Sequence, residues 1–136
     1  MSRRGDLLST HGAVGRLHRG IEIGRDEQGQ TLVAHNSKKH GKVVIETTQE
    51  FSGGAHITVM RHAAPGTQEF VVQRALRMLG TKYDLVNWNC EHFANYAQTG
   101  HLSSEQLRSF ICDAAGQGAV DLALALFNET STNGRR

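Results

Sequence analysis

The sequence predicts an α+β domain in which a small antiparallel β-sheet packs against helices. Its N-terminal part contains short runs of β-branched or alternating apolar residues, separated by polar turns. Its C-terminal part contains apolar residues at helical spacing. Ala64-Pro65-Gly66 separates the two parts, because Pro and Gly interrupt regular elements. At 136 residues, the chain fits a single domain.

Four strands are expected in the N-terminal part, at about 19–23, 31–34, 43–48 and 56–60. The polar stretch 25–30 contains Gly29 and is typical of a hairpin loop between the first two strands. The loop at 36–42 is basic, and residues 51–54 are typical of a turn. Residues 1–13 are polar and are expected to form a flexible N-terminus before the domain proper.

The domain is expected to span 14–112. Three helices are expected within it, at about 67–79, 90–98 and 103–112. The segment 113–127 is the most apolar part of the chain. It is interpreted as a C-terminal helix docked on the core, with a membrane-surface or partner-binding helix as the alternative. Residues 128–136 are polar and are expected to form a disordered tail.

Cys90 stands at the start of one expected helix. Asn89 before it is a favoured N-cap, and Phe93 and Tyr96 follow at helical spacing. Free backbone N–H groups and the helix dipole favour an anion in this first turn, so the thiolate, the reactive form, is favoured. A lone cysteine is also often a small buried hydrophobe, so the position alone does not establish catalysis.

Two histidines provide partners for that thiol. His18 opens the first expected strand, and His35 directly follows the second. Antiparallel pairing of these strands would bring the two rings into one neighbourhood. A nucleophilic thiol needs a base to take its proton, and the base needs a third group to orient it. Cys90, His18 and His35 can fill these three roles.

These segments resemble the lecithin:retinol acyltransferase family, a circularly permuted branch of the NlpC/P60 papain-like thiol enzymes. The similarity runs from about Val14 to Gly100. The H-box of the family is similar to His18-Arg19-Gly20-Ile21-Glu22-Ile23-Gly24, and the NC box to Asn89-Cys90-Glu91-His92-Phe93. The lead-in at 74–85 also fits. The resemblance implies a permuted papain-like fold with the cysteine at a helix N-terminus.

The resemblance also implies roles. Cys90 would be the nucleophile, His18 its base and His35 the group that orients the base. Asn89, Glu91 and His92 would support the site or its oxyanion at the start of the helix. Family members move acyl groups from phospholipids, or hydrolyse them, through a thioester. No cofactor and no protease activity is implied.

The H-box departs from that of the cellular enzymes. Arg19 replaces the usual aromatic residue, Glu22 replaces the usual tyrosine, and the hairpin between the histidines is several residues longer. A carboxylate near His18 is expected to raise the pKa of that ring. The longer loop is expected to move His35 away. Either change would weaken acyl transfer.

Some picornaviral 2A proteins of the H-box/NC kind share both boxes and support genome replication. The short chain and the altered H-box favour this group. The leading hypothesis is therefore a viral non-structural protein that binds viral or host proteins, with weakened or lost acyl transfer. The alternative is an active thiol acyltransferase or phospholipase working through acyl-Cys90.

Charge and cysteine content set further expectations. A formal net charge of +2 does not by itself indicate nucleic-acid binding. The two cysteines do not form a disulfide framework, which favours a reducing, cytoplasmic location, with membrane surfaces of replication sites as the alternative. No signal peptide or spanning helix is expected.

A basic rim is expected from Arg19, Lys38, Lys39 and Lys42, and it is a candidate contact for phospholipid headgroups or RNA phosphates. Such a run is also commonly just a solvated loop. Cys90 and His92 lack the spacing of zinc ligands, so no metal is expected.

Overall fold

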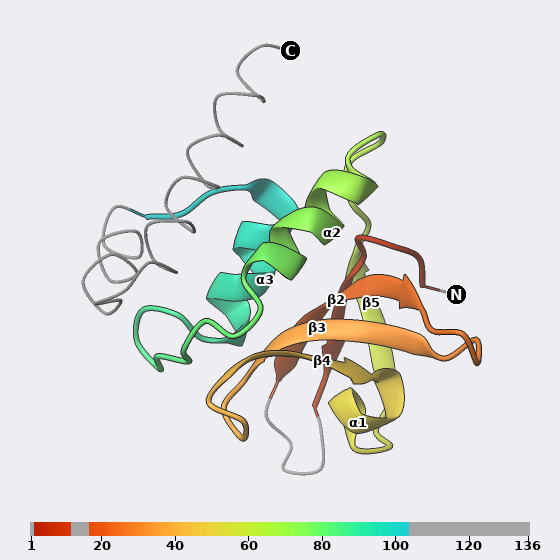
Figure 1. Ribbon diagram of the computed structural model, residues 1–136, viewed down its shortest axis with the longest axis horizontal. Helices are drawn as coiled ribbons and strands as arrows, with labels where there is room; N and C mark the ends of the chain where they lie inside the picture. The colour runs from red at the N-terminus through yellow and green to blue at the C-terminus, as the bar shows by residue number, and fades with distance from the viewer. Residues whose placement is uncertain (1, 12–16, 104–136) are drawn as a thin grey trace.

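A computed structural model describes residues 2–11 and 17–103 (Figure 1). Within them, five strands form one antiparallel sheet in the order β4-β3-β2-β1-β5. The strands are β1 (Leu7–Thr10), β2 (His18–Arg25), β3 (Thr31–Ser37), β4 (Lys42–Thr47) and β5 (Ile57–Arg61). The helices are α1 (Thr48–Ser52), α2 (Gln68–Arg77) and α3 (Cys90–Thr99). The predicted α+β class is thereby confirmed.

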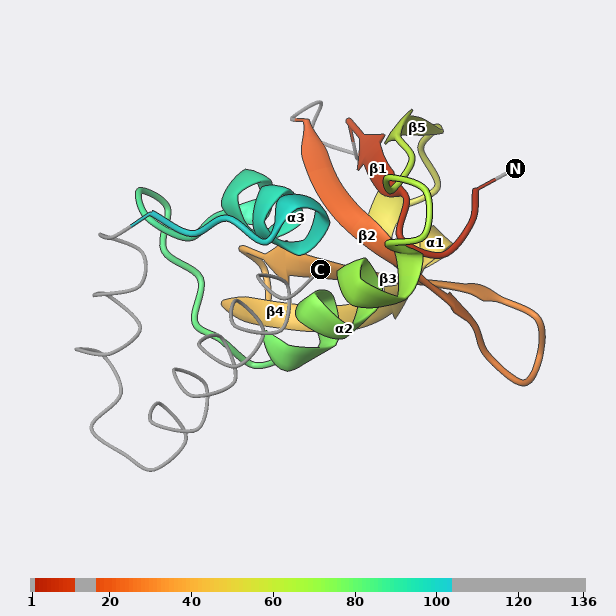
Figure 2. The ribbon, with the colours of Figure 1, turned by 90° about the horizontal axis from the view of Figure 1, so that it is seen from above.

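The main core lies between the sheet and the two longer helices. Helices α2 and α3 pack on one face of the sheet, as the view from above shows (Figure 2). Alternate residues of β2 and β3, such as Ile21 and Ala34, face these helices and meet the apolar sides of Val72 and Phe93. All four side chains are almost completely buried. This packing fixes where α3 begins relative to the sheet.

The opposite face of the sheet carries the short helix α1. Its Phe51 packs with Leu8 and Val33 in a second, smaller cluster. The helix begins at a capping box between Thr47 and Glu50 and ends at Gly53, where φ is 61°. The turn expected at 51–54 is thus the last turn and C-cap of a helix.

Strand β1 is the largest difference from the sequence prediction. Residues 1–13 were expected to be flexible, whereas Leu7–Thr10 form a buried strand between β2 and β5. A strand of four residues with only two aliphatic side chains gives little local signal, and one of its two pairing partners, β5, is distant in sequence. The expected basic loop at 36–42 also begins later, because Asn36 and Ser37 are buried at the end of β3.

The predicted helices at 103–112 and 113–127 and the predicted tail at 128–136 lie outside the described residues, apart from residue 103. Within residues 2–11 and 17–103, no helix combines the length and apolarity needed to cross a bilayer.

Candidate thiol–imidazole site

His18 and His35 meet across two neighbouring strands. His18 is the first residue of β2, and His35 lies on β3, its antiparallel partner. The distance from His18 Nε2 to His35 Nδ1 is 2.7 Å. The longer hairpin does not separate the rings, because its additional residues project beyond the sheet (Figure 1) and a register shift between Glu22 and Gly24 restores the pairing.

Glu46 completes the imidazole side of the site. Its Oε1 lies 2.8 Å from His35 Nε2, and its side chain is 18% exposed. Val44 stands opposite His35 in the β3–β4 register, so Glu46 lies two residues further along the same face. The sequence analysis did not identify this residue. The period-2 alternation of the predicted strand at 43–48 was the signal available for it.

This chain of hydrogen bonds determines where the protons lie. A carboxylate can only accept, so neutral His35 donates from Nε2 to Glu46. The Nδ1 atom of His35 then accepts from His18 Nε2–H. Within residues 2–11 and 17–103, no group bonds to the lone pair of His18 Nδ1. The imidazole that sequence reasoning assigned as the base therefore has one nitrogen available to accept a proton.

Burial keeps both rings neutral at pH 7. Burial, followed by the neighbouring His35, lowers the pKa of His18 to about 4. Burial also lowers the pKa of His35, although the hydrogen bond to Glu46 opposes the shift. Phe51 lies against both rings, with centroid distances of 5.1 Å to each. A neutral imidazole can act as a base, whereas an imidazolium cannot.

The expected effect of Glu22 on His18 is corrected by these contacts. The Glu22 carboxylate is buried and accepts a hydrogen bond from the hydroxyl of Ser2. Burial raises the pKa of Glu22 itself. The pKa of His18 is lowered rather than raised, because burial and the neighbouring His35 both lower it, and the carboxylate near the imidazole pair, Glu46, bonds to His35.

Cys90 is the first residue of α3, as its sequence context predicts. The Asn89 side chain accepts hydrogen bonds from Glu91 N (3.0 Å) and His92 N (3.1 Å), and Asn89 N donates to His92 Nδ1 (3.1 Å). Asn89 and His92 therefore form a reciprocal cap around the cysteine. Cys90 is partly exposed, and among the described residues its thiol has no hydrogen-bond partner.

Two contacts join the strands of the imidazoles to the helix of the thiol. Arg19, next to His18, forms an ion pair with Glu91, next to Cys90, with Nη1 3.0 Å from Oε1. Asn36, next to His35, is fully buried and donates from Nδ2 to the carbonyl of Trp88 at 2.6 Å. Sequence reasoning missed Asn36, although continuing the alternation of β3 beyond residue 34 would have indicated its burial.

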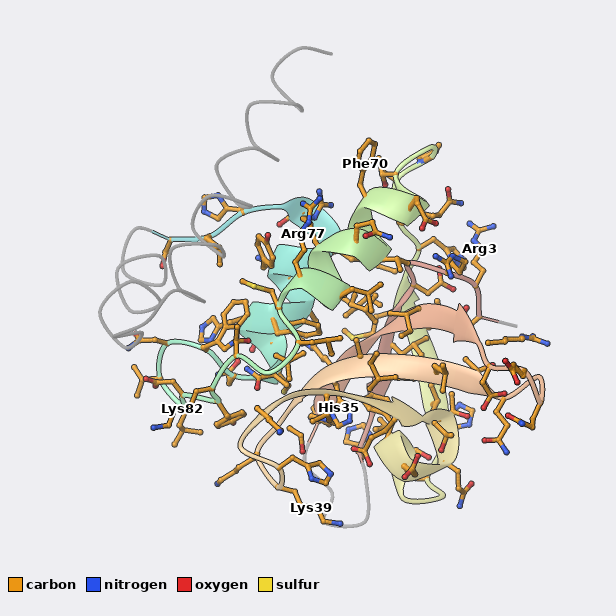
Figure 3. All side chains as sticks on the ribbon, in the orientation of Figure 1. Arg3, His35, Lys39, Phe70, Arg77 and Lys82 are labelled. Atoms are coloured by element: carbon orange, nitrogen blue, oxygen red, sulfur yellow. The ribbon has the colours of Figure 1, made fainter. Side chains whose placement is uncertain are left out.

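The two groups of residues lie on different faces of the sheet. His18 and His35 pack with Phe51 of α1, whereas α3 packs on the face formed by Ile21 and Ala34. Figure 3 shows His35 on the side of the sheet that faces α1. Beside the start of α3 is a pocket of about 490 Å³ lined by Arg19, Glu91, His92, Asn95 and four others, namely Leu7, Met60, Arg61 and Ala94.

The expected basic rim is divided. Lys38, Lys39 and Lys42 are exposed around the turn between β3 and β4. An isolated antiparallel β-bridge pairs Lys42 with Lys82. Arg19 instead lies against α3 through its ion pair with Glu91. The described residues contain no group of three or more His, Cys, Asp or Glu side chains that could hold a metal ion.

Comparison with models of protein families identifies the family of this chain. Residues 2–103 match the family model described as lecithin retinol acyltransferase. This range includes both histidines, Glu46 and the segment around Cys90. A search of curated proteins found no matching sequence.

Proposed function

Because this chain belongs to the lecithin retinol acyltransferase family, we propose that it is a thiol acyltransferase or phospholipase that carries an acyl group on Cys90. The supporting observation is the partly buried chain from Glu46 through His35 to His18, in which His35 is buried and the other two side chains are half-buried. Withdrawing three polar side chains from water is costly unless each is paired, and apolar residues would stabilise a strand pair at least as well. The arrangement is therefore best explained by proton transfer.

The proposed reaction has two displacements. In the first, His18 Nδ1 takes the thiol proton, and Sγ attacks the carbonyl carbon of a lipid ester. The Asn89 side chain already holds the N–H groups of Glu91 and His92, so the Cys90 N–H is the first-turn donor for the oxyanion. The carbon–oxygen bond then breaks, and the leaving alcohol takes the proton from His18.

In the second displacement, an amine, an alcohol or water attacks the thioester. His18 takes the proton of this acceptor and returns it to the departing Cys90 sulfur. Both steps require the thiol, which has no hydrogen-bond partner among the described residues, to approach His18.

The test is intact-mass analysis after incubation with a short-chain phosphatidylcholine. The wild-type protein should gain the mass of one acyl group, in a linkage that hydroxylamine removes. Cys90→Ala should show no adduct, whereas Cys112→Ala, which removes the other cysteine, should keep it. A folded wild-type protein without an adduct would contradict the proposal.

A second candidate is a domain that keeps the fold without the chemistry. We propose, for this case, a viral protein of the 2A H-box/NC kind that supports genome replication by binding viral or host proteins. The free thiol and the Arg19–Glu91 pair, which joins the neighbours of the base and the nucleophile, favour it. It predicts that iodoacetamide modifies Cys90 no faster than a free cysteine and that no adduct forms.

A further inference from the structure

An ordered apolar tip stands in the loop between α2 and α3. Leu85 is 62% exposed and Val86 is 75% exposed, the highest values among the exposed large apolar side chains of the described residues. The tip is firmly built. Asp84 and Trp88 exchange two backbone hydrogen bonds of 2.9 Å, and Asp84 Oδ1 accepts from Val86 N at 2.9 Å. The exposure of these side chains is therefore set by the turn.

This tip is directly connected to the start of α3. Asn89 Nδ2 donates to the carbonyl of Leu85 at 3.2 Å, and Asn89 is the residue that caps the helix at Cys90. Trp88 is 2% exposed, and its Nε1 donates to Thr81 Oγ1 at 3.0 Å, which anchors the base of the turn. The tip and the candidate nucleophile thus belong to one hydrogen-bonded unit.

Lysines stand beside the tip. Tyr83 N donates to Gly41 O at 2.8 Å, and Lys82 and Lys42 form a β-bridge, so the loop before α3 lies along the β3–β4 turn. Figure 3 shows Lys82 at the lower left of the molecule and Lys39 at its lower edge. The four exposed side chains are Lys38, Lys39, Lys42 and Lys82, and none of them forms an ion pair within the described residues.

We propose that Leu85 and Val86, with these four lysines, form a docking surface for an anionic lipid bilayer. We call it the tip surface. The free energy falls when apolar side chains at an exposed apex leave water, and adjacent lysines are attracted to anionic headgroups. An RNA would use the lysines but would leave the aliphatic tip in water, since neither tip side chain offers an aromatic ring for base stacking.

The proposal rests on the proposed function and deepens it, because it brings the start of α3 to the surface where lipid esters lie. Docking would place the bilayer beside Asn89 and Cys90. The substrate class is then a lipid presented in an anionic membrane rather than a dispersed ester.

The test is flotation of the full chain with phosphatidylcholine vesicles that contain either no phosphatidylserine or about a third of it. Using the Cys90→Ala protein separates binding from acyl transfer, so a failure of one proposal does not imply a failure of the other. Binding to the anionic vesicles is expected. Changing Leu85 and Val86 together to Ser should weaken it about tenfold or more, and Lys39→Gln or Lys82→Gln about fivefold each.

Met60→Ser is the matched control, because Met60 is 45% exposed on β5, at the far edge of the sheet from β4. Its vesicle binding should equal that of the parent, and all variants should keep the parent's unfolding midpoint. Vesicle binding by the Leu85/Val86 variant that equals that of the parent would overturn the proposal. So would a parent protein that binds single-stranded RNA but no vesicles, if the Leu85/Val86 variant keeps that RNA binding.

A fluorescent reporter checks which partner covers the tip. Leu85→Trp should add an emission that shifts to the blue only when anionic vesicles are present. An emission already shifted in their absence would mean that another part of the chain, such as the apolar segment 113–127, occupies the tip, and this would also overturn the proposal.

Discussion

The two halves of the candidate site differ in how they are held. In the imidazole half, formed by His18, His35 and Glu46, the His35 ring is buried, the His18 ring is half-buried, and both take part in the hydrogen-bonded chain. In the thiol half, formed by Asn89, Cys90 and His92, the cap around the helix start is complete, but the thiol itself is partly exposed and has no partner among the described residues.

The difference indicates that the proposed base is oriented without any contact from the proposed nucleophile. The carboxylate and two rings fix the tautomer of His18 by contacts within the sheet, independently of α3. The thiol depends on the backbone cap and on the Arg19–Glu91 and Asn36–Trp88 contacts for its position. Variants in the imidazole half should therefore alter proton transfer, whereas variants in the contacts between the halves should mainly alter the position of the Cys90 thiol.

The largest effect is expected from removing the base. His18→Gln should lower the rate of Cys90 acylation by about 10²–10⁴-fold, because no neutral imidazole remains to take the thiol proton. The rate is measured by following the intact-mass adduct over time. His56→Gln changes an exposed histidine outside the site and should acylate like the wild type. If His18→Gln acylates Cys90 as fast as the wild type, the His18 ring does not act as the base for the thiol.

The next effect concerns stability against pH. The pKa of His18 is about 4 in the folded protein and 6.5 in the unfolded chain. As pH falls below 6.5, the unfolded chain binds a proton that the folded protein excludes, so the free energy of unfolding should decrease. The part due to His18 should reach about 2–3 kcal/mol near pH 4.5. Urea unfolding of the wild type and His18→Gln at neutral and acidic pH measures this difference, and equal pH dependence would contradict it.

A smaller effect is expected at the far end of the hydrogen-bonded chain. Glu46→Gln keeps the shape of the side chain but removes the charge that stabilises a protonated relay, so acylation should slow by about 10–100-fold. Glu27→Gln, in the exposed hairpin loop, is the control and should have no effect. The pH profile of acylation distinguishes this role from a purely structural one. Its acid limb should move in Glu46→Gln and should not move in Glu27→Gln.

The smallest effect is expected where the halves meet. Arg19 and Glu91 side chains are 23% and 66% exposed, so Arg19→Gln should lower the free energy of unfolding by only about half a kcal/mol. Its acylation rate should stay within about threefold of the wild type, as measured with Glu91→Gln in a double-mutant cycle. A loss as large as that of His18→Gln would show that this pair contributes far more to the position of the thiol than the exposure of its two side chains implies.

Sequence patterns were sufficient where the signal is local. Asn89 before Cys90 predicted the capped helix, and alternation predicted most of β2 and β3, with His18 opening the first strand and His35 directly following the second. Leu7–Thr10 was missed because its burial depends on insertion between β2 and β5, and β5 lies far along the chain. Glu46 was missed because its role depends on the β3–β4 register, and the low pKa of His18 depends on burial under Phe51, which no local pattern reveals.

The tautomer of His18 is the most direct test of the account. Long-range proton–nitrogen NMR correlations on histidine-labelled protein at pH 7 report which nitrogen of each ring carries hydrogen. We expect a neutral His18 with its proton on Nε2 and a bare Nδ1, and a neutral His35 with its proton on Nε2. A His18 ring that is doubly protonated, or that carries its proton on Nδ1, would contradict it.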